Sequence, residues 1–337
     1  MPTPIGGLAL ILFAGIIGGT VLAPMKWVRV WKFEHTWLFY VFCAYFLSPW
    51  LMAFATVPHL VAVYPAAGLG VVLPTALFGF LWGCSLVLYG VAYDIVGLSL
   101  TSGIILGSSV ALGSLLPLTV LPAARGNSAS PLAIAAADLV MLAGVLVCAW
   151  AGDLREKVQS HAVARPRDPR FRMGILICLV AGVVSTAFNM ALVWGAPLAR
   201  QAQRLGADPF YSANAIWCLS ASVGALPSLL LTSLKIGKQH SWREYRSGPA
   251  ARNAGLCAFM GFLWISGTVL YGSAAGILGP LGPVIGWPVY MSAMILAANF
   301  WGWLTGEWKN VSGRPVLLMF AGIGIQILAM VLLGRLQ

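Results

Sequence analysis

Charged side chains are scarce along this chain. Only 9% of its 337 residues are Asp, Glu, Lys or Arg, whereas a soluble domain carries roughly 25%. Acidic side chains are the rarest, with nine Asp and Glu against 20 Lys and Arg. Because 60% of the residues are hydrophobic, most of the chain cannot face water. This composition excludes an ordinary soluble domain.

Recognisable catalytic and nucleotide-binding motifs are missing as well. The sequence contains no P-loop, GxGxxG, HExxH or nucleophile-elbow pattern. The six cysteines lie inside apolar runs and form no CxxC pair, which is typical of small buried hydrophobic residues. We therefore expect no enzymatic activity, no metal site and no cofactor. An ATP-driven pump would need a nucleotide-binding domain for which the chain has no room.

The apolar residues form ten long runs. A helix needs about 20 apolar residues to cross the hydrocarbon core, and continuous runs of this length favour helices over the short alternating strands of a barrel. The expected spans are 5–22, 37–57, 70–92, 98–120, 132–151, 173–194, 209–234, 255–275, 281–304 and 316–333. No Lys or Arg precedes the first run, so we expect a retained span there rather than a signal peptide. The predicted fold class is an all-α integral membrane protein.

The distribution of basic residues predicts the orientation. Sixteen of the 20 Lys and Arg residues lie in the loops that follow odd-numbered spans: three after the first span, six after the fifth, five after the seventh and two after the ninth. By the positive-inside rule this face is cytoplasmic, so both termini are expected in the periplasm of a bacterial inner membrane. The net charge of +11 thus needs no nucleic-acid partner. The polar stretch 152–172 is the expected cytoplasmic linker.

The two halves, 1–151 and 173–337, repeat each other. Gly-Phe-Leu-Trp at 79–82 recurs at 261–264, Val-Leu-Tyr-Gly at 87–90 recurs at 269–272, and Gly97 matches Gly279, all at an offset of 182. Each half has five spans, so the second half enters the membrane from the opposite side. This predicts a 5+5 inverted-topology repeat, which lets a transporter expose one midplane site to either face.

Polar and aromatic side chains inside the spans are the candidates for binding a substrate. They are Trp82, Tyr89, Ser108, Ser185, Asn189, Asn214, Trp217, Trp264, Tyr271, Trp287, Tyr290 and Asn299. Aromatic rings stack on the C–H face of a sugar while amides bind its hydroxyls. For any single ring, an interfacial belt or helix packing stays an alternative.

Two glycine-rich segments at matching positions, 97–103 and 279–288, mark possible breaks in the spans. Pro288 would leave the Val284 carbonyl without its usual donor, although a simple packing kink explains it equally well. Gly103 and Gly107 lie four residues apart, a spacing that predicts close helix packing.

Three acids are candidates for coupling to a proton. Asp138 is expected inside the fifth span, about 10 Å from its outer end, and an intramembrane acid is a functional hypothesis by default. Asp94 and Glu307 fall near the cytoplasmic ends of spans, where an ordinary interfacial charge is the competing interpretation. A secondary carrier with the proton as coupling ion, or a facilitator, is the expected class.

Several stretches, in order along the chain, resemble the L-rhamnose–proton symporter family of the drug/metabolite transporter superfamily. They are Ala23-Pro24-Met25-Lys26 with Trp31; Leu77-Phe78-Gly79 with Trp82-Gly83 and Tyr89-Gly90; Gly97 with Ser99; Leu205-Gly206-Ala207-Asp208-Pro209-Phe210-Tyr211; and Glu307-Trp308-Lys309-Asn310 with Gly313-Arg314-Pro315. The resemblance implies ten helices and uptake of a 6-deoxyhexose with a proton across the bacterial inner membrane.

The chain departs from the family pattern at some polar positions. Leu86 and Leu88 stand where the family has amides in the third span, and Gly267 replaces a glutamine in the eighth. The apolar stretch 281–285 replaces an acidic residue, while Asn189 and Asn214 stand where the family has Ser and Leu. These departures concern the substrate and the coupling ion.

Three functions stay open at this stage. The first is proton-coupled import of a sugar, with L-rhamnose or a related 6-deoxyhexose as substrate. The second is an exporter or exchanger of amphipathic or aromatic metabolites on the same fold, which the aromatic, amide-poor third span favours. The third is a membrane-embedded enzyme or receptor, which would need a catalytic cluster that the sequence does not show.

Overall fold

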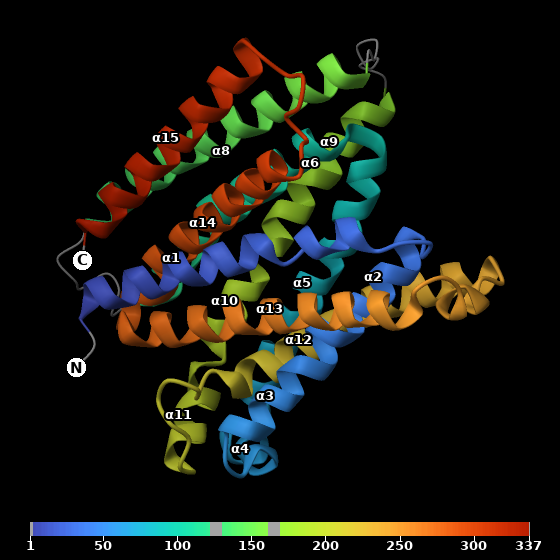
Figure 1. Ribbon diagram of the computed structural model, residues 1–337. Coiled ribbons are helices and arrows are strands. Elements are labelled where there is room, and N and C mark those ends of the chain that lie inside the picture. The colour runs from blue at the N-terminus through green and yellow to red at the C-terminus, as the bar shows by residue number, and fades with distance from the viewer. Residues whose placement is uncertain (1–2, 122–129, 161–168, 337) are drawn as a thin grey trace.

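The computed structural model describes residues 3–121, 130–160 and 169–336, and within them the regular secondary structure is entirely helical (Figure 1). Ten helical segments of the described residues are long and apolar enough to cross a membrane. The prediction of ten membrane-spanning helices is thereby confirmed.

Some spans consist of a single helix, and others are interrupted. The first half comprises α1 (Pro4–Thr20), η1 (Ala23–Trp27), α2 (Phe33–Val41), the π-helical η2 (Phe42–Leu47), α3 (Ser48–Thr56), α4 (Leu60–Ala67), α5 (Leu69–Val96), α6 (Leu98–Val120) and α8 (Pro131–Ser160). The second half comprises α9 (Pro169–Ser185), α10 (Ala187–Trp194), α11 (Ala196–Arg204), α12 (Asn214–Lys238), η3 (Trp242–Arg246), α13 (Ala250–Ile277), η4 (Gly279–Leu281), α14 (Gly282–Leu304) and α15 (Arg314–Gly334).

Helix α8 is longer than its sequence predicts. It runs on to Ser160 and α9 already begins at Pro169, so both flanks of the predicted linker 152–172 are helical, while 161–168 lie outside the described residues. An ion pair one helical turn apart, between Asp153 and Lys157, supports the extension.

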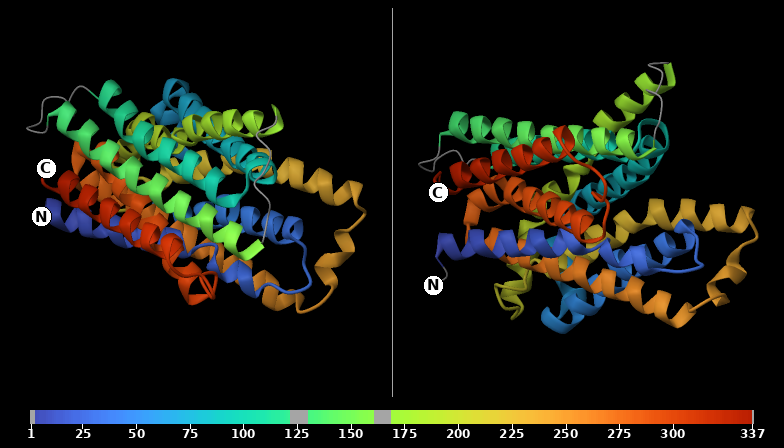
Figure 2. Two further views of the ribbon diagram at one scale, coloured as in Figure 1. Left: turned by 90° about the horizontal axis from the view of Figure 1, so that it is seen from above. Right: turned by 45° about the horizontal axis from the view of Figure 1, so that its top comes forward.

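The bundle has two ends that differ in character. The start of α1 and the end of α15 lie together at one end, which we call the termini end (Figures 1 and 2). The opposite end, which we call the basic end, holds the helix ends at Trp27, Val96, Lys238 and Leu304. The basic end carries the ion pairs of Lys26, Lys32, Arg155 and Lys235, as the positive loops predict for the cytoplasmic face.

The two halves interlock rather than lie side by side. Helix α1 packs against α13 and α14 of the second half, whereas α9 and α10 pack against α5 and α6 of the first. The first span of each half thus packs against spans of the other half, so the contacts of one half have counterparts in the other. In addition, Gly97 and Gly279 both have positive φ, 93° and 63°, in the third-to-fourth and eighth-to-ninth connections. The packing is consistent with the inverted repeat, which stays a prediction.

Glycines let the helices approach closely around the centre. A side chain at Gly79 or Gly83 of α5 would collide with the backbone of Ser220 or Gly224 in α12. On α6, a side chain at Gly103 or Gly107 would collide with α8, which confirms the close packing predicted for that pair. The contact between α5 and α12 places Trp82 beside the bundle axis.

Candidate functional site

A cluster of aromatic rings occupies the centre of the bundle. Its members, which we call the aromatic cluster, are Tyr45, Trp82, Phe188, Trp217, Trp264, Tyr271, Trp287 and Tyr290. Trp82 and Trp264, at equivalent positions of the predicted repeat, stack with ring centroids 6.0 Å apart at 25°. Six of the sequence-predicted binding residues are thus brought into one site.

Tyr45 joins the two stacked tryptophans. Its ring lies edge-on to both indoles, with ring centroids 5.0 Å from Trp82 and 4.8 Å from Trp264. It lies in the π-helical η2, and such wide turns are frequent at functional sites. Pro49 lacks an N–H and would clash with the Tyr45 carbonyl in a regular helix, while the Ser48 hydroxyl donates to the Ala44 carbonyl at 3.1 Å. The proline thus explains the turn that presents Tyr45.

Phe188 reaches the cluster from the sixth span, where the helix is interrupted. A turn at Thr186 separates α9 from α10. Two positions further on, Phe188 stacks on Trp217 at 4.9 Å and 18° and contacts Trp82 at 4.5 Å. Interrupted helices beside a central site are a recurring feature of transporters.

Asn189 ties four helices together on the termini side of the cluster. Its amide nitrogen donates to the carbonyls of Gly113 in α6, at 2.7 Å, and Pro283 in α14, at 2.9 Å. Its amide oxygen accepts from the Tyr271 hydroxyl of α13 at 2.6 Å. The Trp287 indole donates to the Ser109 carbonyl at 2.9 Å. These neutral, buried hydrogen bonds close the termini half of the bundle.

The cluster contains aromatic faces, phenol hydroxyls and indole N–H groups but no formal charge. The Tyr40 and Tyr45 hydroxyls pair at 3.3 Å. The Trp217 indole is fully buried and has no hydrogen-bond partner among the described residues. An ion would find no countercharge here, so the cluster suits a neutral solute that combines apolar faces with hydroxyls.

The other sequence-predicted binding residues lie around the cluster or away from it. Ser185 donates to the Ser109 hydroxyl at 3.3 Å, between α9 and α6, and Ser108 packs against Gly182 nearby. Away from the cluster, the Tyr89 hydroxyl pairs with Ser102.

Two predicted amides bond elsewhere. The Asn214 amide donates to the Thr56 hydroxyl at 2.8 Å, and Asn299 donates to the Ile295 carbonyl of its own helix at 2.9 Å. In this conformation neither amide is directed at the cluster.

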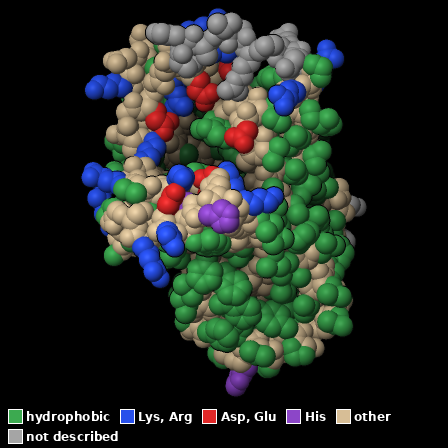
Figure 3. Space-filling model, turned by 90° about the vertical axis from the view of Figure 1, so that its right-hand side faces the viewer, with side chains coloured by type: hydrophobic (Ala, Val, Ile, Leu, Met, Phe, Trp, Pro, Cys, Tyr) green, Lys and Arg blue, Asp and Glu red, His purple; other side chains and the backbone are tan. Residues whose placement is uncertain are grey.

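The three acids occupy unlike surroundings. Asp138 is 1% exposed within α8, and neither carboxyl oxygen has a hydrogen-bond partner among the described residues. Asp94 is exposed and helps to line a cavity of about 350 Å³ at the basic end, together with Tyr93, Leu98 and Glu156. Figure 3 shows acidic and basic side chains around a recess on this face.

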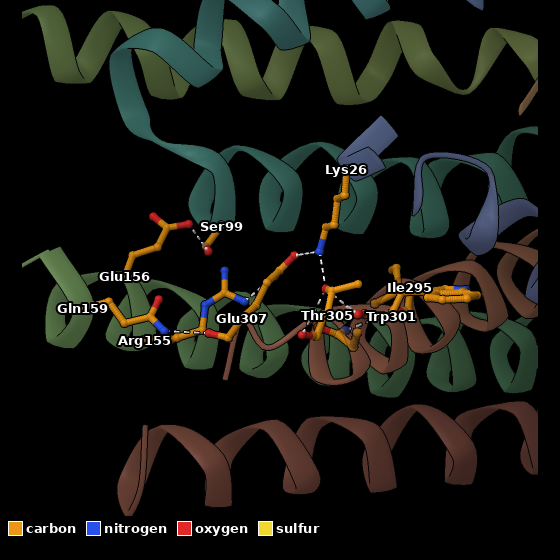
Figure 4. A network of polar contacts seen from close by, with 11 residues as sticks. Lys26, Ser99, Arg155, Glu156, Gln159, Ile295, Trp301, Thr305 and Glu307 are labelled. Atoms are coloured by element: carbon orange, nitrogen blue, oxygen red, sulfur yellow. Dashed lines mark hydrogen bonds and ion pairs between the residues drawn. The ribbon is translucent and has the colours of Figure 1, made fainter. Parts of the chain in front are cut away.

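Glu307 is the centre of a polar network at the basic end (Figure 4). Its carboxylate pairs with Lys26 and with Arg155, the latter at 2.7 Å, and its carbonyl accepts from the Gln159 amide at 2.6 Å. Burial raises the pKa of Glu307, but the hydrogen bonds and charges of Lys26 and Arg155 outweigh it, so the pKa falls below the ordinary 4.5. Glu307 is therefore an ionised structural link.

Sequence reasoning missed three aromatic residues of this region, Tyr40, Tyr45 and Phe188. Pro49, four residues after Tyr45, was the available signal, because it disturbs the helix at that carbonyl. Phe188 directly precedes Asn189, which was a candidate, but a phenylalanine in an apolar run carries no distinguishing mark. No sequence pattern distinguished Tyr40 from the other aromatic residues of its span.

Ten apolar spans around a buried, uncharged aromatic cluster place the chain in the class of multi-pass membrane proteins. Within it, the family model described as L-rhamnose-proton symport protein matches residues 5–336. The chain therefore belongs to that family. It is 26% identical over 323 residues to the L-rhamnose-proton symporters of Citrobacter koseri and Salmonella paratyphi A, covering 93% of this chain and 92% of each relative.

Proposed function

We propose that this protein takes up a sugar together with a proton, and that the sugar is L-rhamnose or a related 6-deoxyhexose. The family and the relatives named above support this activity. The observation that carries it on this chain is the aromatic cluster, which joins stacking faces to hydroxyl groups without any charge.

The chemistry of the cluster suits a deoxysugar. Indole and phenol rings bind the C–H faces and the methyl group of such a sugar, and the Tyr45 and Tyr271 hydroxyls and the Trp217 indole can bind its hydroxyls. In this conformation the Trp82 and Trp264 rings contact each other. Sugar binding therefore replaces ring–ring contacts, and the two tryptophans separate to admit it.

The two ends of the bundle support the proposed direction of transport. The basic end faces the cytoplasm by the positive-inside rule, and the termini end faces the periplasm of the bacterial inner membrane. The termini half is closed by the bonds of Asn189, while the basic end is recessed. Rocking of the two inverted halves would open the ends in turn.

An exporter or exchanger of amphipathic or aromatic metabolites is the second candidate. It is favoured by the density of aromatic rings and by Asn189, whose amide is fully engaged with protein groups in this conformation. Such a transporter would move aromatic solutes in exchange for protons and would not accumulate L-rhamnose.

Uptake into proteoliposomes tests the proposal. An inward proton gradient should drive accumulation of labelled L-rhamnose, and a membrane potential should change it, since one charge moving through 100 mV is worth roughly 2.3 kcal/mol. If no sugar accumulates under any gradient, the proposal fails. Flux that ignores voltage would indicate a facilitator.

A pair of variants on α13 tests the location of the site. Trp264→Ala should weaken sugar binding by about 1–3 kcal/mol, a loss of roughly 5- to 150-fold, because a stacking face is removed. Phe262→Ala removes a ring two residues away that is 57% exposed on the outer surface of the bundle, and should leave binding unchanged. Equal effects of the two changes would argue against the aromatic cluster.

A further inference from the structure

A buried acid and a buried hydroxyl meet between α6 and α8. Asp138 is 1% exposed and Ser114 is fully buried, and neither side chain has a hydrogen bond of ordinary geometry within the described part of the chain. The Ser114 hydroxyl nevertheless lies close enough to interact with the Asp138 carboxyl. Burying polar groups without hydrogen-bond partners costs free energy of folding, so the presence of this pair indicates a functional role.

Among the residues that the structure describes, the charge of an ionised Asp138 would have no hydrogen-bond or ion-pair partner. Helices α6, α14 and α15 pack against α8, and their titratable or charged side chains are Tyr290 of α14 and Arg314 of α15. Arg335, which directly follows α15 at the termini end, is exposed, and no ion pair joins it to Asp138 among the described residues. Arg314 stands at the basic start of α15, over the Trp150 ring at 5.0 Å. Within α8 the nearest such group is Cys148, ten positions away. The surroundings therefore accommodate the neutral carboxylic acid and not the carboxylate.

The same turn of α6 connects this acid to the aromatic cluster. Ser114 interacts with Asp138, while the carbonyl of the adjacent Gly113 accepts the Asn189 amide at 2.7 Å. The Trp287 ring lies so close to Gly113 that a side chain there would collide with it. Two consecutive residues of α6 thus contact the acid on one side and the cluster on the other.

A second contact links the acid's helix to the cluster. The Ser292 hydroxyl of α14 donates to the sulfur of Met141, one turn from Asp138 on α8. Trp287 and Tyr290 belong to that same α14. A change in the packing of α8 therefore affects α6 and α14, the two helices whose carbonyls accept from Asn189.

We propose that Asp138 carries the co-transported proton, and that the adjacent residues Gly113 and Ser114 transmit its protonation state to the aromatic cluster. This rests on the proposed symport function. The protonated acid permits the dry contact of α6 with α8. When its O–H bond breaks, the proton passes to water and the carboxylate stays on Asp138. The carboxylate requires hydration, so the α6–α8 contact must open and, through Gly113, loosen Asn189 and Trp287.

The other acids do not fit this role. Glu307 is held ionised by Lys26 and Arg155 at the basic end. Asp94 is exposed beside the recess and does not lie in a buried contact between helices.

The test uses Asp138→Asn in proteoliposomes, with Asp153→Asn as the matched control on the same helix. Asp153 pairs with Lys157 at the basic end and should behave as wild type. A gradient of one pH unit drives up to about tenfold accumulation in a 1:1 symport. The Asp138→Asn protein should show no accumulation but should still exchange labelled for unlabelled sugar across the membrane. Accumulation by this variant, or loss of exchange in a folded variant, overturns the proposal.

Two further measurements separate this inference from the symport function itself. Ser114→Ala should retain sugar exchange but move the midpoint of the pH profile of uptake. Tryptophan fluorescence of the aromatic cluster, followed against pH without sugar, should change in the wild type and stay flat in Asp138→Asn. If the wild type moves no sugar at all, the symport proposal fails, and the fluorescence titration still decides the role of Asp138. An unaltered titration in the variant would refute it.

Discussion

The two ends of the bundle are closed by different kinds of bond. At the termini end, Asn189 joins Gly113, Pro283 and Tyr271 through hydrogen bonds among buried, neutral groups. At the basic end, Glu307 holds Lys26 through an ion pair in which the two side chains are 39% and 38% exposed. One closure is buried and uncharged, and the other is partly exposed and ionic.

This difference has an energetic consequence. A buried polar group that loses its partner costs about 1–3 kcal/mol, whereas an exposed ion pair contributes about 0–1 kcal/mol and is weakened by salt. The exposed Lys26–Glu307 pair is therefore easier to break than the bonds of Asn189, whereas the second partner of Glu307, Arg155, is only 13% exposed. For the proposed importer, with the basic end facing the cytoplasm as we propose, this favours release of the solute from the basic end once the termini end has closed.

The largest expected effect of a single change follows from Asn189. Asn189→Ala removes three hydrogen bonds and should lower the free energy of unfolding in mixed micelles by roughly 2–3 kcal/mol. It should also make the termini end more accessible to a thiol reagent at an introduced cysteine. Asn299→Ala is the matched control, because that amide bonds only to its own helix and should cost under about 0.5 kcal/mol. Equal losses would mean that Asn189 does not close the termini half.

The hydrogen bonds of the predicted amides show what the sequence alone does not determine. The ten spans and the matching tryptophans Trp82 and Trp264 could be predicted, because apolar length and repeat register are properties of the chain itself. The bonds of Asn189 could not, since two of its partners are backbone carbonyls that every residue possesses. Asn214 and Asn299 carry the same side chain but bond elsewhere, because tertiary packing decides which way an amide points.

A second expected effect, of intermediate size, concerns the π-helical turn. Pro49→Ala restores an N–H that can bond the Tyr45 carbonyl, so η2 should relax toward a regular helix and withdraw Tyr45 from the two tryptophans. The loss of edge-on ring contacts should weaken sugar affinity by about 0.5–1.5 kcal/mol, or two- to tenfold. Binding can be measured by quenching of tryptophan fluorescence. An affinity equal to that of the wild type would show that the turn does not position Tyr45.

The smallest expected effect concerns the ionic closure. Lys26→Met removes the exposed partner of Glu307 and leaves Arg155 in place. It should cost less than about 1 kcal/mol of stability at low salt, and the difference from wild type should vanish at about 1 M salt, because exposed pairs are screened. The stability lost in Asn189→Ala should be insensitive to salt, because its hydrogen bonds join neutral groups.

The pH dependence of that closure has a defined sign. The pKa of Glu307 in the folded protein lies below its ordinary value of 4.5, so its stabilisation is fully present above that value and is lost as the pH falls through the folded pKa. Wild-type and Glu307→Gln proteins should therefore keep a constant difference in thermal stability between about pH 6 and 8 and converge only in acid. Convergence already near neutral pH would mean that Glu307 is not held ionised by Lys26 and Arg155, and the contrast between the two ends would then fall.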